Sequence, residues 1–136
     1  DQLLEFPPEV LQLIGDRQPD AAFDIIRRML PYRPYGTDLG FCLDIFCKQH
    51  LSTVTGRTTV IILGDGRNNF NSPRLDLVKM LQRRARRLIW LNPEAERQWG
   101  VGDSDMREYA ALCDAVYPVR NLAQLSSAVD KLLAGG

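Results

Sequence analysis

The sequence predicts an α/β fold in which one parallel sheet is covered by helices on both faces. Residues 58–63, 88–91 and 115–119 are apolar runs of strand length, and a stretch with helical spacing of apolar residues follows each of them. Such alternation implies parallel strands joined by right-handed crossovers. The first two runs end in polar clusters, at residues 65–66 and 92–94, which is where parallel sheets bind ligands.

Three helices are expected ahead of the first strand. Pro7 and Pro8 suit the first turn of a short helix that ends near residue 14. Asp20 is a suitable N-cap for a second helix that ends before Pro31. Thr37 is a suitable N-cap for a third helix, which places an apolar face toward the core.

The first strand, residues 58–63, is a continuous β-branched run, which is typical of a strand buried on both faces. A bare apolar edge invites pairing with another chain, so its outer flank is expected to be occupied. The sequence therefore predicts that the neighbouring strand lies upstream of Asp1 and that the sheet is truncated at the amino terminus. The alternatives are amino-terminal residues folded over this edge, or a homodimer paired through residues 58–63.

The later elements alternate regularly. Residues 75–86 form a predicted helix that leads to the second strand, and residues 104–113 form the helix that leads to the third. Asn121 is the expected N-cap of the last helix, with Gln124 at the capping-box position. The apolar side chains of that helix predicted to face the core are Leu122, Leu125, Val129 and Leu132.

Length and composition predict a single domain over residues 1–136, with 17 basic and 17 acidic side chains that cancel. Nothing in this balance favours nucleic acid, and no stretch is long and apolar enough to span a membrane. The three cysteines lack metal-ligand spacing and fit buried thiols in a reducing cytoplasm. The basic run at residues 83–87 ends a helix, where cations suit the macrodipole.

Four motifs carry a resemblance to a known family. Their order is Tyr-Gly-Thr-Asp-Leu-Gly (35–40), Ile-Leu-Gly-Asp-Gly-Arg-Asn-Asn (62–69), Trp-Leu-Asn-Pro-Glu (90–94) and Trp-Gly-Val-Gly-Asp-Ser-Asp-Met (99–106). Residues 32–133, which bear these motifs, resemble the CoxE-like branch of von Willebrand factor A (VWA) domain proteins. The resemblance implies a three-layer, Rossmann-like sheet, of which this chain is the carboxyl-terminal portion.

The resemblance also implies a metal-ion-dependent adhesion site. Family members combine an Asp-x-Ser-x-Ser loop with a Thr and an Asp from two further loops, and Thr37 and Asp65 match the last two. The chain has no Asp-x-Ser-x-Ser, which is expected upstream of Asp1. Two oxygen ligands are a poor magnesium site. Mg²⁺ or another divalent cation is therefore expected in the intact domain, with weak or absent binding in this chain.

Polar residues around this site are predicted to form a partner-binding rim. Several residues of the site and of the rim have an alternative explanation: Asp65 and Gly66 can form a simple turn, Asn92 and Glu94 can cap the next turn, and Asp103 can cap the helix that follows it. The predicted rim residues are Asp38, Asn68, Asn69, Asn92, Glu94 and Asp103.

The resemblance implies a non-enzymatic protein–protein interaction module in the cytoplasm, with no catalytic residues. Its implied partner is a MoxR-type AAA+ ATPase, and the pair would mature a metalloenzyme. One alternative is a magnesium-dependent phosphoester hydrolase built on Asp65, Glu94 and Asp103. Another is a structural fragment with a decayed metal site, because Gly64 stands where many VWA domains carry Thr.

Overall fold

The computed structural model describes residues 7–29 and 38–135, and the chain divides into two compact units, Asp1–Gly36 and Thr37–Gly136. The first unit contains α1 (Pro8–Gly15) and α2 (Pro19–Met29), which pack against each other. Asp20 was expected to cap α2, but the helix begins one residue earlier, because proline suits the first helical position. The single domain predicted for residues 1–136 stays a prediction.

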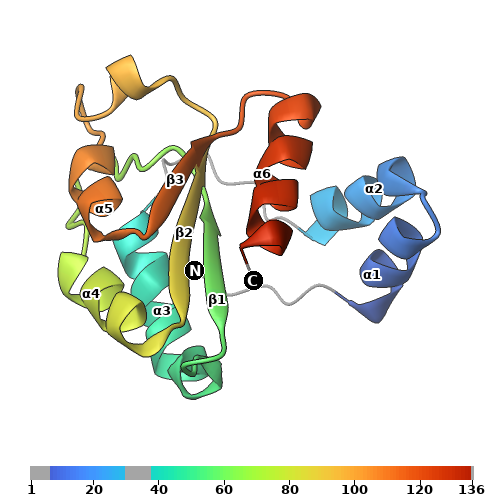
Figure 1. Cartoon of the computed structure of the whole chain (residues 1–136), viewed down its shortest axis with the longest axis horizontal. Coiled ribbons are helices and arrows are strands. Elements are labelled where there is room, and N and C mark those ends of the chain that lie inside the picture. Colours follow the sequence, from blue (N-terminus) through green and yellow to red (C-terminus); the bar gives the residue numbers. More distant parts are fainter. Residues whose placement is uncertain (1–6, 30–37, 136) are drawn as a thin grey trace. The chain divides into compact units, whose positions relative to one another are not determined.

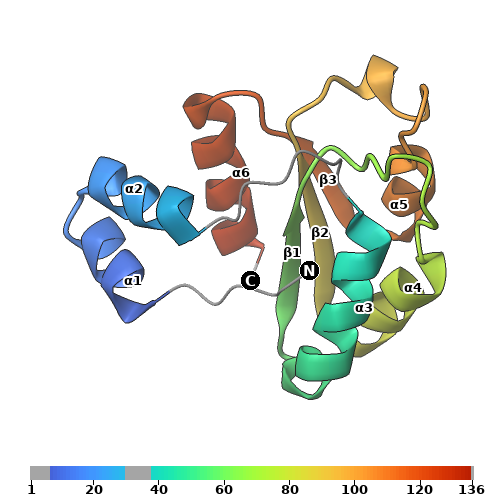
Figure 2. The same ribbon diagram turned by 180° about the vertical axis from the view of Figure 1, so that it is seen from behind.

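The second unit is built on a three-stranded parallel sheet in the order β1-β2-β3. One face is covered by α3, α4 and α5 and the other by α6 (Figure 1; Figure 2 from behind). This confirms the predicted α/β fold with helices on both faces. The bounds are α3 (Leu39–His50), η1 (Leu51–Thr53), β1 (Thr59–Leu63), α4 (Leu75–Arg84), β2 (Arg87–Asn92), η2 (Glu96–Gln98), α5 (Met106–Leu112), β3 (Ala115–Pro118) and α6 (Leu122–Ala134).

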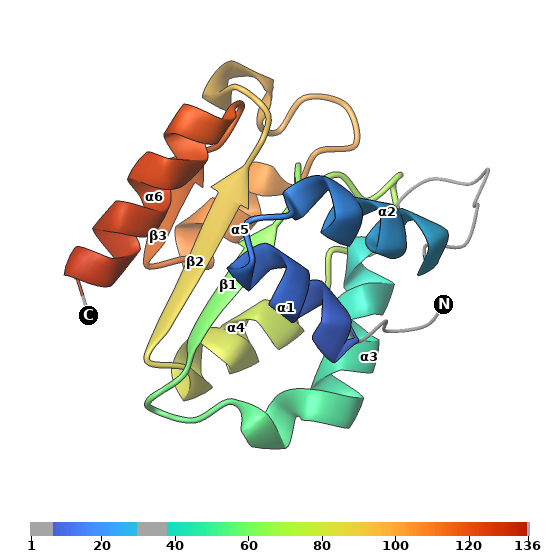
Figure 3. The same ribbon diagram turned by 90° about the vertical axis from the view of Figure 1, so that its right-hand side faces the viewer.

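The register of the sheet brings the ends of the strands together. Leu63, the last residue of β1, lies beside Leu91, and Asn92, the last residue of β2, lies beside Pro118. The strands are seen side by side, with their carboxyl ends in common, in Figure 3. The loops that leave β1 and β2 therefore start from one edge of the sheet.

The central strand β2 contributes to the core on both faces of the sheet. Its residues from Leu88 to Asn92 are all buried, and the Trp90 ring stacks on Tyr109 of α5 with centroids 4.8 Å apart. On this face the core continues into α3 and α4. On the other face Ile89 and Leu91 pack against Ala128 of α6. No helix among the described residues is long and apolar enough to cross a membrane.

The prediction that the first strand is buried on both faces is wrong. Val60 and Ile62 pack into the core, but Ile61 is 50% and Leu63 70% exposed. The reason is that α6 packs on β2 and β3, while β1 is the edge of the sheet. Within the described ranges β1 pairs only with β2. A groove of about 430 Å³ runs along it, lined by residues of α3, η1 and β1. The expected neighbour on this flank stays a prediction.

The start of α3 differs from the sequence prediction, whereas the start of α6 agrees with it. The N-cap of α3 is Asp38, whose Oδ1 accepts the Phe41 N–H at 2.9 Å, whereas Thr37 lies outside the described residues. Asn121 caps α6 as predicted, accepting the Gln124 N–H at 2.9 Å. The inward stripe of α6 is Leu125, Ala128 and Leu132. Leu122 and Val129 were expected to face inward, but they are 83% and 41% exposed. The reason is that the three-stranded sheet is narrow, and only the stripe of Leu125, Ala128 and Leu132 lies against it.

Gly40 allows the loop after β1 to lie against the first turn of α3. A Cβ built on Gly40 would stand 2.0 Å from the Ser72 carbonyl oxygen, which is far inside van der Waals contact. The close approach joins two segments 32 residues apart in the sequence and helps to fix the loop that leaves the carboxyl end of β1.

Gly40→Ala should destabilise the domain. Helix propensity alone would favour alanine by up to about 1 kcal/mol. The clash with backbone should reverse the sign and cost about 1–3 kcal/mol net. Urea unfolding measures the difference. Gly56→Ala is the matched control, because a Cβ there meets nothing within 4 Å, and its change should stay within about 0.5 kcal/mol. A Gly40→Ala protein as stable as the wild type would contradict the close packing.

Candidate functional site

Arg67 ties together the loops at the carboxyl edge of the sheet. Its guanidinium binds Glu94 through two bonds, Nε to Oε1 at 2.8 Å and Nη2 to Oε2 at 3.1 Å. Its Nη1 donates to Asp103 Oδ1 at 2.7 Å and to the Val101 carbonyl at 3.1 Å. Charge-assisted bonds of this kind are short and directional. One side chain from the loop after β1 thus holds two points of the loop after β2.

Hydrogen bonding in this cluster changes the pKa of Arg67 and of Asp103. Hydrogen bonding to Glu94, and then to Asp103, raises the pKa of Arg67 above its usual range. The Arg67 guanidinium in turn lowers the pKa of Asp103, with the Asn69 backbone N–H adding to the effect. Arg67 and Asp103 are about a quarter exposed, 27% and 24% respectively, so the cluster borders water.

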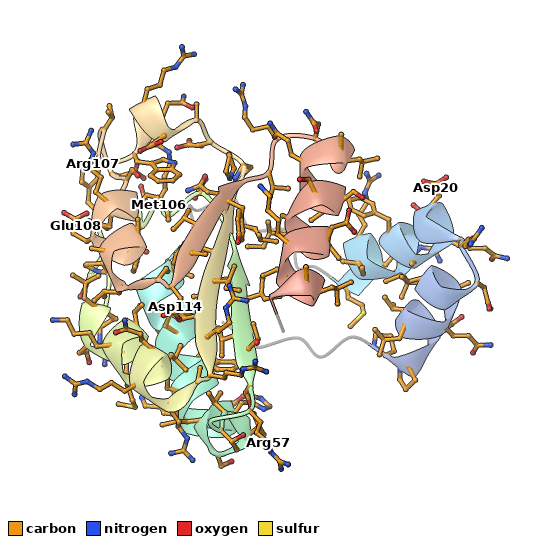
Figure 4. The ribbon with its side chains drawn as sticks, viewed as in Figure 1. Asp20, Arg57, Met106, Arg107, Glu108 and Asp114 are labelled. Carbon is orange, nitrogen blue, oxygen red and sulfur yellow. The ribbon has the colours of Figure 1, made fainter. Side chains whose placement is uncertain are left out.

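The backbone brings these loops into register. Gly66 has φ +75°, and a Cβ there would lie 2.9 Å from Met106 Sδ, so glycine is required by conformation and by space. Arg67 and Ser104 form an isolated antiparallel bridge, and the Asp105 N–H donates to the Gly66 carbonyl at 2.9 Å. Figure 4 shows Met106 on the side of α5 toward the sheet, with Arg107 on its outer side.

Asn68 is the buried centre of the edge. Its Oδ1 accepts the Leu39 N–H at 3.1 Å, and its Nδ2 donates to Asp105 Oδ2 and Tyr109 Oη, both at 2.8 Å. The Tyr109 hydroxyl in turn donates to the Pro73 carbonyl at 2.8 Å. Burial raises the pKa of Tyr109 to about 12. The amide of Asn68 therefore links α3, α5 and the loop after β1.

Asp65 and Asn92 lie side by side where β1 and β2 end. Asn92 Nδ2 donates to the Asp65 carbonyl at 3.2 Å, and Asn92 Oδ1 accepts the Glu94 N–H at 2.7 Å. Asp65 Oδ1 accepts the Arg67 N–H at 3.0 Å, which is an Asx turn. The turn explanations considered from the sequence thus describe real bonds, and both residues still stand at the predicted edge.

The predicted rim residues divide into buried and accessible ones. Asn68 and Asn92 are fully buried, so we assign them a positioning role beneath the surface. The predicted residues that retain exposure are Asp38, Asn69, Glu94 and Asp103. Of these, Asp38 caps α3, because its Oδ1 accepts the Phe41 N–H. The Asn69 N–H donates to Asp103 Oδ2 at 3.1 Å.

Asp103 does not cap the following helix. That alternative is wrong because α5 begins at Met106, whose N–H donates to Ser104 Oγ at 3.4 Å, with Asp105 as N-cap residue. The carboxylate of Asp103 is turned instead to Arg67 and the Asn69 N–H.

The described side chains at this edge offer few free oxygen ligands to a divalent cation. Among the described residues no group of three His, Cys, Asp or Glu side chains converges in the manner of a metal site. Glu94 and Asp103 are bonded to Arg67, and Asp65 gives one oxygen to its own turn. Thr37, the other predicted ligand, lies outside the described residues. The described side chains alone therefore do not fit a magnesium site.

Arg67 and Asp105 are the residues that sequence reasoning missed. Both stand inside the motifs at 62–69 and 99–106, but neither is among the expected metal ligands or rim residues. An available signal was the arginine in a polar turn directly after a strand, since a cation there needs carboxylates from neighbouring loops. Which carboxylates it meets depends on the tertiary fold.

The sequence of this chain matches a known protein family. Residues 9–127 match the family described as VWA domain containing CoxE-like protein. The chain therefore belongs to the CoxE-like VWA family. No curated protein and no solved structure matches the chain significantly.

Stability should depend on pH through Asp103. Because its pKa is lower in the folded protein, Asp103 stabilises the fold above the ordinary carboxyl pKa of about 3.9, and this contribution is lost as the pH falls through the lowered value. Asp103→Asn should therefore lower the Tm near neutral pH, and the difference from wild type should shrink below about pH 4. Thermal unfolding across this range measures it, with Asp130→Asn on α6 as the control. A difference independent of pH would contradict the ion pair.

Proposed function

We propose that this chain is a non-enzymatic protein–protein interaction module of the VWA type, whose partner docks at the carboxyl edge of the sheet. The observation that carries the proposal is the Arg67 clamp on Glu94, Asp103 and Val101. It fixes two loops against each other at the border with water. A surface held in one conformation loses little entropy on binding, which favours recognition of a partner.

We further propose that the partner is a MoxR-type AAA+ ATPase in the cytoplasm and that the pair acts in metalloenzyme maturation. Membership in the CoxE-like family supports this partner by analogy. The partly exposed carboxylates of Asp65, Glu94 and Asp103 are the polar groups that such a partner would meet.

For the metal we propose that Asp65, together with Thr37, belongs to a cation site that further oxygen ligands complete. Magnesium requires near-octahedral oxygen coordination, which the described side chains do not supply by themselves. Residues 1–136 should then show weak or no magnesium binding by calorimetry. Tight stoichiometric binding would require a site other than the one outlined here.

Replacing Asp65 should weaken binding of the ATPase. Asp65→Ala removes a carboxylate from the centre of the docking edge, and the affinity for a purified MoxR-type ATPase should fall at least about tenfold. Surface plasmon resonance, with and without magnesium, measures it. Asp130→Ala removes an exposed carboxylate from α6 and is the matched control. Equal affinities for the wild type and Asp65→Ala would remove this edge from the interface.

No contact among the described residues favours the magnesium-dependent phosphoester hydrolase over the interaction module. Glu94 and Asp103, which such an enzyme would use, are engaged by Arg67. Magnesium-dependent hydrolysis of p-nitrophenyl phosphate that disappears in Asp65→Ala would favour the enzyme.

We also propose that a second copy of the chain pairs with the open flank of β1. The Gly64 N–H donates to the Leu91 carbonyl, and the Arg86 N–H donates to the Thr58 carbonyl. The backbone N–H and C=O groups of the even-numbered residues of this segment therefore point to β2. The N–H and C=O groups of Thr59, Ile61 and Leu63 then point away from β2.

Antiparallel pairing about Ile61 would match these groups with those of a second copy. It would also set Arg57, at the amino end of β1 (Figure 4), opposite Asp65 of the other copy. Opposite charges in register support such a two-fold contact.

Sedimentation should therefore reveal a dimer. Ile61→Lys places a charge at the two-fold axis, where it faces its own copy, and should shift the protein to monomer. Because Ile61 is 50% exposed, the variant should still fold, which circular dichroism checks. Leu133→Lys, on α6, is the control and should leave the dimer intact. A wild type that stays monomeric at high concentration would refute the pairing.

A further inference from the structure

An aromatic side chain is held in water beside the Arg67 cluster. Phe70 is 83% exposed, and it follows Asn69 in the loop after β1. Both residues have positive φ, +50° for Asn69 and +61° for Phe70. Asparagine tolerates the left-handed region, but a bulky residue such as phenylalanine rarely occupies it. Strained conformations of this kind concentrate at functional sites.

Hydrogen bonds from both sides fix the strained segment. The Asn68 N–H donates to the Asp103 carbonyl at 3.2 Å, and the Asn69 N–H donates to Asp103 Oδ2 at 3.1 Å. After the strained pair, the Asn71 N–H donates to the Asn68 carbonyl at 2.9 Å. Because Arg67 holds Asp103 in turn, the conformation of Phe70 is imposed by the cluster beneath it.

Two further exposed apolar side chains stand on the segments that contact this loop. Val101 is 56% exposed, and its carbonyl oxygen accepts a hydrogen bond from Arg67 Nη1. Phe41, which is 41% exposed, follows Gly40, where a Cβ would clash with the Ser72 carbonyl oxygen. We call Phe41, Phe70 and Val101 the apolar rim. Hydrogen bonds hold the backbone at or next to each of the three residues, so the fold fixes where the backbone of the apolar rim lies.

The charge beside the apolar rim indicates the chemistry of its partner. The hydrogen-bonded cluster contains the guanidinium of Arg67 and four carboxylates, those of Asp65, Glu94, Asp103 and Asp105. Its net charge is therefore negative. Arg97 and Arg107, which follow β2 in the sequence, are adjacent to Glu96 and Glu108, so these two segments add no net positive charge. An apolar pocket bordered by lysine or arginine complements this surface, whereas an anionic membrane would be repelled.

We infer that Phe70 is the anchor residue of the docking edge, and that it inserts into an apolar pocket bordered by basic side chains on the protein partner. This inference rests on the proposed function and identifies the side chain on which partner binding depends. Exposed aromatic residues at the centre of an interface dominate its binding free energy. Because hydrogen bonds fix the backbone around Phe70 before binding, this segment also loses little backbone entropy when it docks.

The test compares folding and binding in the same variants. Phe70→Gly removes the ring and relieves the positive φ, so it should raise the Tm by about 3 °C. Its affinity for the purified MoxR-type ATPase should nevertheless fall at least tenfold. Phe70→Trp keeps a large aromatic side chain and should bind within threefold of the wild type. Leu133→Ala removes a 77% exposed apolar side chain from α6 and should bind as the wild type does.

Each other outcome overturns a specific claim. If Asp65→Ala loses binding and Phe70→Gly keeps it, the proposed function stands and the anchor is refuted. If the wild type does not bind the ATPase, both fall together. If the wild type binds vesicles of phosphatidylserine and phosphatidylcholine through Phe70, the side chain is a membrane contact and the protein pocket is refuted.

Discussion

The carboxyl edge of this domain depends on one guanidinium. Arg67 lies between Glu94 and Asp103 at bonding distances of 2.7 to 3.1 Å, and it thereby fixes two loops that the sheet alone would leave separate. Asp103, once fixed, binds the backbone of residues 68 and 69. The position of the loop after β1 and the exposure of Phe70 both follow from this arrangement. A cation at the centre of an acidic edge also limits the repulsion among its carboxylates.

A buried uncharged amide, that of Asn68, also links separate segments of the chain at this edge. Asn68 satisfies the first N–H of α3, a carboxylate of the α5 cap region and the Tyr109 hydroxyl at once. Every polar atom of this side chain has a partner, which is what burial of an amide requires. Tyr109 then joins the polar network to the apolar core, because its ring stacks on Trp90 while its hydroxyl binds Pro73. The edge is consequently continuous with the core of the sheet.

The opposite situation holds at β1, where an apolar strand is the outermost of the described sheet. A five-residue run of Thr, Val, Ile, Ile and Leu reads as doubly buried, because sequence records side-chain character and says nothing of what lies beside it. In the structure only alternate residues are covered. The exposed row and the groove along it are the features that self-pairing would bury. The carboxyl edge of the sheet and the open flank of β1 thus present two distinct surfaces, the first polar and rigid, the second apolar and extended.

The sequence alone determined the alternation of strands and helices, their parallel order and the polar edge where β1 and β2 end. Hydrophobic period and turn chemistry are local, and so they can be read from neighbours in the chain. Tertiary structure alone decided that Arg67 meets Glu94 and Asp103, 27 and 36 residues away, and that Asn68 and Asn92 are buried. It also decided that Asp38 is the N-cap of α3, in place of the predicted Thr37, and that Asp105 rather than Asp103 is the N-cap residue of α5. These outcomes depend on which loops meet in space. A local pattern of residues does not encode contacts between loops that are far apart in the sequence.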